Sequence, residues 1–249
     1  MKAAWYEKTG EAQMVLQIGE LDNPVPNKGE VLVQLKTSGI NPSDVKTRAG
    51  ARGELQFPKI IPHSDGAGTI VDVGEGVDKN RIGERVWIWN GAFGRAFGTC
   101  AELISLPEFQ AAKINDSVDF KSAACIGIPA STAYYGIFAN GSVKDKTVLI
   151  SGGAGAVGFY GIQLAKLSGA NVISTISSDE KAEVAQEAGA DKVINYKNED
   201  VVEEIMNYTD NKGVDRIFEV EFGGNLSINE KVLKSNGVIA AYGLSLIHI

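Results

Sequence analysis

The architecture of the second half of the chain is indicated by the glycine-rich segment Ser151-Gly152-Gly153-Ala154-Gly155-Ala156-Val157-Gly158. The apolar run Thr147–Ser151 predicts a β-strand before it, and the helical spacing of apolar residues in Val157–Leu167 predicts an α-helix after it. Glycines at positions 152, 155 and 158 therefore lie between a strand and a helix, with the spacing G-x-x-G-x-x-G. This context is typical of a dinucleotide-binding loop.

Each glycine of this loop has its own physical role in binding a dinucleotide. Gly152 permits the tight turn, Gly155 lets the backbone approach a pyrophosphate, and Gly158 lets helix and strand pack closely. The first helical residues, Ala156, Val157 and Gly158, offer free N–H groups and partial positive charge to the phosphates. The alternative is a glycine-rich turn that binds no ligand, which the strand–turn–helix context disfavours.

The alternation of strand and helix continues to residue 241. Strands are predicted at Asn171–Ile176, Lys192–Asn195, Arg216–Val220 and Gly237–Ala241, and helices at Asp179–Ala188, Val201–Tyr208 and Leu226–Lys234. Ser177 and Glu180 have the spacing of a capping box for the first of these helices, and Gly189 is placed to end it. Five strands alternating with four helices predict an α/β fold with a doubly wound parallel sheet.

The first half of the chain has a different character. All seven prolines and all three tryptophans lie within the first 129 residues. Short β-type runs bounded by glycine and proline occur there at Lys2–Tyr6, Met14–Ile18, Val31–Thr37, Gly68–Val73, Arg85–Trp89 and Ala101–Ser105. These runs predict an irregular, mostly antiparallel β domain. We therefore expect two domains, 1–125 and 126–249.

Composition and charge limit the class of protein. The 249 residues are 44% hydrophobic and 22% charged, as in globular proteins, which excludes a disordered or collagen-like chain. The net charge of -7 disfavours nucleic acid as a partner. No apolar segment of signal-peptide length precedes the first acidic residue, Glu7, so we expect a cytoplasmic location.

Two further features of the composition bear on membranes and thiols. The uncharged stretch Ser122–Val143 is as long as a membrane span, but glycine and proline interrupt it. We therefore expect a buried core and a domain junction there rather than a transmembrane helix. Cys100 and Cys125 are the only cysteines, and we expect them to be free and buried.

The corner after the second predicted strand of the parallel sheet reads Ile176-Ser177-Ser178-Asp179-Glu180-Lys181. A fold specific for NAD has Asp or Glu there to bind the ribose 2'-hydroxyl. Here Ser177, Ser178 and Lys181 are suited to a 2'-phosphate, which favours NADP. Asp179 and Glu180 count against NADP unless they only stabilise the first turn of the helix.

Several segments of the sequence together resemble one family. They are Ile40-Asn41-Pro42-Ser43-Asp44, Asp65-Gly66-Ala67-Gly68, Gly83-Glu84-Arg85-Val86, Ile128-Pro129-Ala130-Ser131-Thr132-Ala133-Tyr134 and Glu219-Val220-Glu221-Phe222-Gly223-Gly224-Asn225-Leu226. With the glycine loop, they are similar to the zinc-free quinone oxidoreductases, the zeta-crystallin-like branch of the medium-chain dehydrogenase/reductase superfamily. The resemblance extends from residue 1 to Gly243.

The resemblance implies a GroES-like catalytic domain followed by a Rossmann domain, and hydride transfer from NADPH to a quinone or a related electron-poor enone. It also implies the positions of the site residues. Asn41 and Thr132 would lie near the nicotinamide. The adenosine 2'-phosphate would be surrounded by Ser177, Ser178, Lys181 and Tyr196, and the inner cofactor cleft would be lined by Phe222 and Gly243.

Zinc-dependent alcohol dehydrogenases of the same superfamily are an alternative. Near the positions of two of their zinc ligands, this chain has Ile40 and Ser64, so we expect no metal site of thiolate or imidazole ligands. His63 is adjacent to one of these positions, where many relatives have glycine. We interpret it as a loop histidine hydrogen-bonded to backbone rather than as a metal ligand.

Hydride transfer to a quinone needs no covalent nucleophile. The protein must hold the nicotinamide and the acceptor together, exclude water and stabilise the negative charge that develops on the acceptor oxygen. Lys46 and Arg48 are the candidate donors to that oxygen, and with Asn41 they are the candidate catalytic residues. A salt bridge with Asp44 is the alternative role for Arg48. The family often has an aromatic residue where this chain has Lys46, so the resemblance does not imply the acceptor.

Aromatic residues are the remaining candidates for the acceptor pocket. The segment Val86–Phe93 is expected to wall it, with one of Trp87 and Trp89 facing the core and the other the cleft, and core packing of both is the alternative. Tyr134 and Tyr135 are expected to be packing residues at the domain junction rather than proton donors.

The end of the sequence gives a separate expectation. Leu244–Ile249 follows the fifth strand of the parallel sheet directly, whereas the family has a return segment that completes the sheet and supplies the dimer edge. We expect a truncated chain or a foreign end, with an incomplete sheet and poor solubility or no activity. A full-length form is expected to be a homodimer. A non-catalytic NADPH-binding protein is the alternative to an enzyme.

Overall fold

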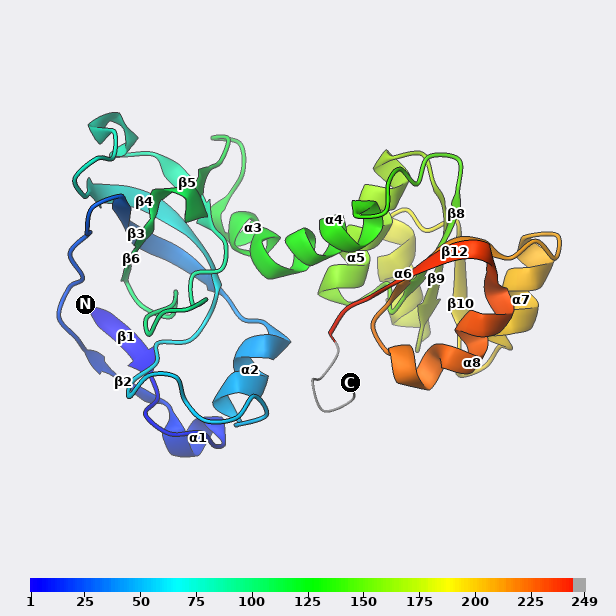
Figure 1. Cartoon of the computed structure of the whole chain (residues 1–249), viewed down its shortest axis with the longest axis horizontal. Helices are drawn as coiled ribbons and strands as arrows, with labels where there is room; N and C mark the ends of the chain where they lie inside the picture. Colours follow the sequence, from blue (N-terminus) through cyan, green and yellow to red (C-terminus); the bar gives the residue numbers. More distant parts are fainter. Residues whose placement is uncertain (244–249) are drawn as a thin grey trace. The chain divides into compact units, whose positions relative to one another are not determined.

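The computed structural model describes residues 1–243. The chain folds into two compact units, Met1–Ile128 and Pro129–Ile249, and each has its own sheet (Figure 1). The expectations about Leu244–Ile249 fall outside the described residues.

A five-stranded antiparallel sheet forms the body of the first unit. Strands β3 (Glu30–Gly39), β4 (Asp65–Val73), β5 (Arg85–Ile88), β6 (Leu103–Pro107) and β7 (Ala111–Lys113) pair in the order β6-β3-β4-β5-β7. Alternate residues of β3, Val31 and Val33, are buried together with Ile70, Val86 and Ile104 of other strands. Strands β1 (Lys2–Trp5) and β2 (Gln17–Glu20) form a separate antiparallel pair. The predicted antiparallel β domain is confirmed.

Short helices lie between these strands and after the last of them. They are α1 (Ala12–Val15), α2 (Pro42–Arg48) and α3 (Phe120–Ala124), with the 3-10 turns η1 (Lys79–Arg81) and η2 (Glu108–Gln110). The predicted strand at Met14–Ile18 is wrong, because this stretch contains the end of α1 and the start of β2. So short an apolar run has no periodicity that separates helix from strand. Its buried residue, Val15, packs beside Gly10.

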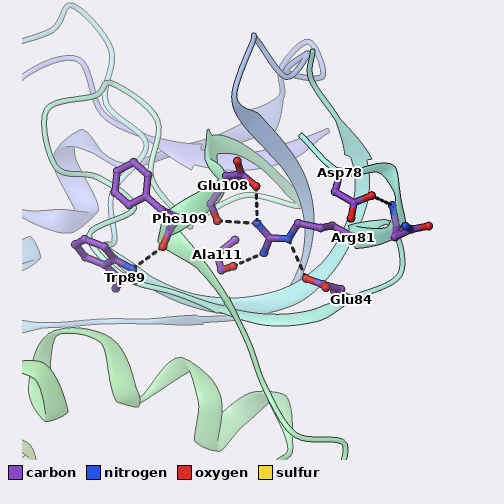
Figure 2. Close-up of polar contacts among 8 residues, drawn as sticks. Asp78, Arg81, Glu84, Trp89, Glu108, Phe109 and Ala111 are labelled. Atoms are coloured by element: carbon purple, nitrogen blue, oxygen red, sulfur yellow. Dashed lines mark hydrogen bonds and ion pairs between the residues drawn. The ribbon is translucent and has the colours of Figure 1, made fainter. Parts of the chain in front are cut away.

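Arg81, at the end of η1, connects separate segments of the first unit (Figure 2). Its Nε donates to Oε2 of Glu84 at 3.0 Å, its Nη1 to the carbonyl oxygen of Glu108 at 3.0 Å, and its Nη2 to that of Ala111 at 2.6 Å. The carboxylate of Glu108 adds an ion pair at 3.2 Å. Because the guanidinium is mostly buried, these bonds replace the water that it has lost. They fix η1 against the segment that joins β6 to β7.

A parallel sheet forms the second unit. Strands β8 (Thr147–Ser151), β9 (Asn171–Ile176), β10 (Lys192–Asn195), β11 (Val214–Glu219) and β12 (Leu233–Ala241) pair in the order β10-β9-β8-β11-β12. Adjacent residues of β8 face different cores. Val148 and Ile150 pack with residues of the helices α4, α5 and α6, and Leu149 packs with residues of α7 and α8. The predicted doubly wound parallel sheet is confirmed.

The helices of this unit are α4 (Ser131–Phe138), α5 (Ala156–Leu167), α6 (Asp179–Glu187), α7 (Val201–Tyr208) and α8 (Phe222–Val232). The strands β8, β9 and β10 and the helix α7 have the predicted limits. The helix α8 starts and ends earlier than predicted. Gly223 and Gly224 are weak helix formers and hide its start, but the carboxylate of Glu219 accepts a hydrogen bond from the N–H of Glu221 just before the helix. The predicted capping box of α6 is also wrong, because its N-cap is Ser178 and makes no side-chain cap bond.

Arg216 of β11 is buried and connects the central part of the sheet to α4. Its guanidinium donates to the carbonyl oxygens of Ile137, Asn140 and Gly141. These carbonyls lie at the C-terminal end of α4, where a helix leaves its last acceptors unpaired. The positive charge also complements the negative end of the helix dipole.

The uncharged stretch 122–143 forms α3, the π-helical turn η3 (Ile126–Ala130) and α4. No helix among the described residues is long and apolar enough to cross a membrane. The prediction that both cysteines are buried is wrong, because Cys100 is half-buried and Cys125 is exposed. The small residues around Cys125 made the whole stretch look like core, but the chain turns there between two short helices.

Substitution of Arg81 by Lys tests the connection described above. Lysine cannot reproduce the planar fork that reaches two backbone carbonyls and two carboxylates, so we expect the free energy of unfolding to fall by about 2 kcal/mol. Urea unfolding followed by tryptophan fluorescence measures this effect, since all three tryptophans lie in the first unit.

Lys28→Ala is the matched control, because Lys28 forms an ion pair with Glu75 in which both side chains are exposed. Its unfolding free energy should stay within about 0.5 kcal/mol of the wild type. Equal effects of the two substitutions would contradict the special contribution of Arg81.

Candidate functional site

The glycine loop connects β8 to α5, and backbone hydrogen bonds fix its shape. The N–H groups of Gly152 and Gly153 donate to the carbonyl oxygen of Thr175 in β9, at 3.1 and 3.2 Å. Gly152 has a φ of +71°, a left-handed conformation that favours glycine. Gly155, the N-cap of α5, donates through its N–H to the carbonyl oxygen of Gly152 at 2.9 Å. The loop is therefore a tight turn tied to the neighbouring strand.

The loop lies so close to α5 that a side chain at position 158 would displace it. A Cβ added to Gly158 would be 2.4 Å from the carbonyl oxygen of Gly152 and 2.9 Å from the Cα of Gly153. In the first turn of α5, the N–H groups of Ala156, Val157 and Gly158 make no hydrogen bond within residues 1–243. These groups and the positive end of the helix dipole suit a diphosphate, so the residues present fit a dinucleotide.

The corner after β9 brings together part of the set expected at the 2'-phosphate. The Nζ of Lys181 lies 2.9 Å from the Oγ of Ser177. A hydrogen bond from the Ser178 side chain holds the pKa of the Glu180 carboxyl below its usual value. Tyr196 is exposed, and its backbone N–H donates to the end of β9 at 3.1 Å. Hydroxyl and ammonium groups suited to a phosphate therefore lie side by side at this corner.

A cavity of about 270 Å³ lies at the carboxyl ends of β8, β9 and β11. Its lining includes Gly152, Thr175, Tyr196, Asn225 and Asn229. In open parallel sheets, ligands bind outside the carboxyl ends of the strands where the strand order reverses, and here the order reverses between β8 and β11. The cavity therefore adjoins the glycine loop at the place where sheets of this kind bind ligands.

Glu219, at the end of β11, is a buried carboxylate to which the sequence pattern gave no role. Its Oε2 accepts hydrogen bonds from the Ser151 hydroxyl and the Asn229 side chain, each at 3.0 Å. Its Oε1 accepts from the Asn225 side chain at 2.9 Å and from the N–H of Glu221 at 2.7 Å. The carboxylate thus fixes two amide side chains that line the cavity. The available signal was an acidic residue at the end of a largely buried strand.

Asn41 and Asp65 form a buried pair in the first unit. Nδ2 of Asn41 donates to Oδ2 of Asp65 at 2.7 Å, and the N–H of Ile128 lies 2.9 Å from both carboxylate oxygens. The N–H of Asn41 donates to Asp44 at 2.8 Å in the capping box of α2. Burial raises the pKa of Asp65 to about 6, with hydrogen bonds from Asn41 and Ile128 opposing the rise and the charge of Asp44 adding to it. The orientation of the Asn41 amide is therefore set by Asp65, which the sequence analysis did not place in the site.

His63 has a φ of +77°, which is uncommon for a residue with a side chain. Its carbonyl oxygen accepts from the N–H of Thr99 at 2.9 Å. Its ring nitrogen Nδ1 lies 2.9 Å from the Oγ of Ser38. His63 is therefore bonded to backbone through its own carbonyl oxygen, whereas the partner of its ring is a side-chain hydroxyl, that of Ser38 at the end of β3.

The two candidate cations of α2 have different surroundings. Lys46 is exposed, whereas the Nη1 of Arg48 donates to the carbonyl oxygen of Gly10 at 2.5 Å. Asp44 accepts instead from the N–H of Asn41. The alternative of an Arg48 salt bridge with Asp44 is thus replaced by a bond to backbone.

The remaining predicted residues are spread over both units. Thr132 is the second residue of α4, Phe222 is the first residue of α8, and both are half-buried. Gly243 has a φ of +72°. Trp87 packs on a buried cluster, and the Nε1 of Trp89 donates to the carbonyl oxygen of Phe109 at 3.2 Å.

The packing role of Tyr134 and Tyr135 at the domain junction stays a prediction. Both side chains are exposed, and the Tyr134 ring lies edge to face with the Phe138 ring within α4. Glycine at position 136 puts one face of α4 close to the sheet, and both tyrosines lie away from that face.

Two family descriptions match this chain. Residues 27–143 match the alcohol dehydrogenase GroES-like domain, and residues 156–248 match the zinc-binding dehydrogenase domain. A solved mycobacterial quinone oxidoreductase is 30% identical, with a TM-score of 0.84 over 98% of this chain and 74% of that chain. The chain belongs to the medium-chain dehydrogenase/reductase superfamily. The resemblance to its quinone oxidoreductases is confirmed, and the chain is an oxidoreductase of that superfamily.

Other members of the family have the same extent of similarity. Human quinone oxidoreductase is 28% identical over 244 residues, which are 98% of this chain and 73% of that protein. The solved quinone oxidoreductase of Escherichia coli in complex with NADPH is 27% identical, with a TM-score of 0.83 over 100% of this chain and 77% of that chain. This chain thus spans about three quarters of the length of each.

The side chains available as metal ligands bear on the alternative that the protein is a zinc-dependent alcohol dehydrogenase. Among residues 1–243, no three His, Cys, Asp or Glu side chains gather closely enough to hold a metal ion. The two family positions considered from the sequence are Ile40, an exposed apolar residue, and Ser64, whose carbonyl oxygen accepts from the N–H of Gly91 at 2.8 Å. Neither side chain is a thiolate or an imidazole, so these residues do not fit a zinc ion.

Substitution of Gly158 by Ala tests the close approach in the glycine loop. The added Cβ would be 2.4 Å from a backbone oxygen, so the loop must move away from α5. We expect the affinity for NADPH to fall at least about tenfold, measured by fluorescence titration. Leu167→Gln, at the other end of α5 where Leu167 is 85% exposed, should leave the affinity unchanged. Wild-type affinity in Gly158→Ala would show that this contact does not shape the binding loop.

Substitution of Asp65 by Asn tests the buried pair. The folded protein raises the pKa of Asp65 from 3.8 to about 6, so the native state binds the proton more tightly than the unfolded chain. This contribution to stability, about 3 kcal/mol, is fully present below the unfolded pKa and is lost as the pH rises through about 6. We therefore expect Asp65→Asn to unfold with a flatter pH dependence between about pH 4 and 7.

The measurement is the urea midpoint of unfolding of the wild type and of Asp65→Asn at several pH values across this range. Asp116→Asn is the control, since the Asp116 side chain is 98% exposed, and its pH dependence should match the wild type. An unaltered slope in Asp65→Asn would mean that this carboxyl titrates like a solvent-exposed one.

Proposed function

We propose that this protein is an NADPH-dependent reductase that transfers a hydride to a quinone or a related electron-poor enone without a metal ion. The observation that carries the proposal is the set of free N–H groups at the start of α5, next to a corner with hydroxyl and ammonium groups. This pairing suits a dinucleotide with an additional phosphate. The NADPH complex of the Escherichia coli relative supports the choice of cofactor.

Different residues would bind different parts of the cofactor. The N–H groups of the first turn of α5 hold the diphosphate. The 2'-phosphate is bound by Ser177, Ser178, Lys181 and Tyr196, and the nicotinamide end by Asn41, Thr132, Phe222 and Gly243. Bound NADPH supplies a hydride, and the protein positions the acceptor and excludes water.

Negative charge develops on the acceptor oxygen as the hydride arrives, and a cationic side chain stabilises it. We assign this role to Lys46, because it is exposed on α2, while Arg48 already donates to the carbonyl oxygen of Gly10. Asn41 lies at the start of the same helix and is held by Asp65. Asn41, one of the residues proposed at the nicotinamide, and Lys46, proposed at the acceptor oxygen, therefore belong to one short helix.

The test is a comparison of NADPH and NADH oxidation across a panel of quinones, enones and enals. The proposal expects NADPH-dependent turnover with at least one quinone or enone, unchanged by a metal chelator. Saturable NADPH binding without turnover on any acceptor would favour a non-catalytic binding protein. Stoichiometric zinc in the purified protein, with activity lost on chelation, would favour a zinc-dependent dehydrogenase.

Substitution of Lys181 by Ala tests the choice between the two cofactors. Loss of the ammonium group should weaken NADPH binding about tenfold and leave NADH binding unchanged, because only NADPH has the 2'-phosphate. Titration of both cofactors measures the two affinities. Lys231→Ala, in the last turn of α8, should affect neither. An equal loss for NADPH and NADH would exclude Lys181 from the recognition of the phosphate.

A further inference from the structure

His63 lies in a hydrogen-bonded cluster at the end of β3 and the start of β4. Its Nδ1 is 2.9 Å from the Oγ of Ser38, and that Oγ is 2.8 Å from the Oγ1 of Thr99. The hydroxyl of Thr99, which is fully buried, donates to the carbonyl oxygen of Asp65 at 2.6 Å. The cluster therefore ends at the residue that orients Asn41.

The donors in this cluster determine which nitrogen of the ring carries the proton. Thr99 has one hydroxyl proton, which it donates in the hydrogen bond to the carbonyl oxygen of Asp65. Ser38 must therefore donate to Thr99, so its oxygen is left to accept a proton from Nδ1 of His63. The neutral ring is thus the Nδ1–H tautomer, whose Nε2 has a free lone pair. This Nε2 makes no hydrogen bond to any residue between Met1 and Gly243.

The backbone holds His63 in an unfavourable conformation. Its φ of +77° is held from both sides, because the N–H of Cys100 donates to the carbonyl oxygen of Pro62 at 3.1 Å and the N–H of Thr99 donates to the carbonyl oxygen of His63 at 2.9 Å. Backbone strain of this kind persists where the surrounding structure imposes it, and it is frequent at functional sites. Here it keeps the ring next to Ser38.

The position of His63 links this cluster to the proposed reaction. Ser38 precedes Asn41 by three residues, and Asp65 follows His63 by two. Asn41 is the residue proposed at the nicotinamide, and it bonds directly to Asp65. The ring therefore belongs to the same polar cluster as the proposed nicotinamide contact.

We propose that His63 is the proton donor of the reaction and that Ser38 and Thr99 are positioning residues for its ring. The inference rests on the proposed function. The acceptor gains a hydride, which bound NADPH supplies, and a proton from Nε2–H of the imidazolium, so that its oxygen becomes a hydroxyl. The ring is left as the neutral Nδ1–H tautomer and takes a new proton from water. The balance is one hydride and one proton for each acceptor reduced.

The charged and titratable groups around the ring set the direction of its pH dependence. Asp44 of α2 interacts with the ring, and Arg52, Asp65 and Cys100 each interact with Asp44. Burial lowers the pKa of His63 below 6.5, and the carboxylate of Asp44 opposes that shift. Burial raises the pKa of Cys100, which keeps it a thiol. The imidazolium, which is the donor form, therefore accumulates only as the pH falls below 6.5.

The first test is the pH profile of kcat/KM for NADPH-dependent reduction of a quinone. In the wild type, kcat/KM should rise as the pH falls below 6.5. His63→Asn should remove this rise and lower kcat/KM at acid pH on the order of 100-fold, toward the lower end of the range for general acid catalysis. Asparagine tolerates a positive φ, and His63→Gly is a second variant that relieves the strain entirely. Asp65→Asn should retain the rise, which separates His63 from the other group that titrates near this pH.

The second test needs neither cofactor nor turnover. Nitrogen chemical shifts of the histidine rings in the protein without ligand report the tautomer, and His63 and His248 are the only histidines, so His63→Asn assigns the signal. We expect the Nδ1–H tautomer in the wild type and a larger share of the Nε2–H tautomer in Ser38→Ala. A wild-type ring protonated at Nε2 when neutral would overturn the inference.

The outcomes distinguish this inference from the proposed function. Turnover with an unchanged pH profile in both His63→Asn and His63→Gly would overturn the role of His63 and leave the reductase assignment in place. An absence of turnover with every quinone and enone would overturn both.

Discussion

The close approach of α5 to the glycine loop is the constraint on which the second unit depends. The carbonyl oxygen of Gly152 faces the position where residue 158 would otherwise have a Cβ, and the N–H groups of Gly152 and Gly153 are tied to Thr175 of β9. Two strands and the helix between them are thereby joined at one point. The free N–H groups of α5 are consequently held in place before any ligand arrives, so binding costs little ordering of the backbone.

Both units use a buried carboxylate at a strand end to orient amide side chains. Asp65, at the start of β4, holds Asn41, and Glu219, at the end of β11, holds Asn225 and Asn229. A buried carboxylate is costly unless hydrogen bonds compensate its lost hydration. Asp65 accepts from Asn41 and from a backbone N–H, and Glu219 accepts from four groups. The same bonds that make burial tolerable also fix the amides, so stability and positioning come from one arrangement.

The fold was largely predictable from sequence because its signals are local. The strands β8, β9 and β10 are short apolar runs bounded by turns, and the glycine spacing defines the loop between β8 and α5. The start of α8 was not predictable in this way, since Gly223 and Gly224 obscure it and the stabilising carboxylate comes from β11. The strand predicted at Met14–Ile18 was wrong for a different reason, because this run has too few residues to show whether its apolar residues follow the helix or the strand period.

The candidate site was predictable in its parts but not in its connections. Family resemblance pointed to Asn41 and to the corner at Ser177 and Lys181, whose side chains the structure brings within 2.9 Å of each other. It gave no role to Asp65, and His63 was interpreted as a loop residue bonded to backbone. Their relation depends on hydrogen bonds through Ser38 and Thr99, which are far apart in the sequence. Such long-range polar contacts leave no periodic pattern for sequence reasoning to detect.

The bonds from Arg216 to the end of α4 have a consequence for the cooperativity of the second unit. A helix of eight residues is too short to be stable alone in water, so α4 depends on its contacts with the sheet. The Arg216 guanidinium of β11 donates to carbonyl oxygens at the C-terminal end of α4. Fraying of α4 would therefore leave this buried charge without hydrogen-bond partners. The segment that enters this unit and the middle of its sheet therefore form a single cooperative folding unit, although about 80 residues of chain separate them.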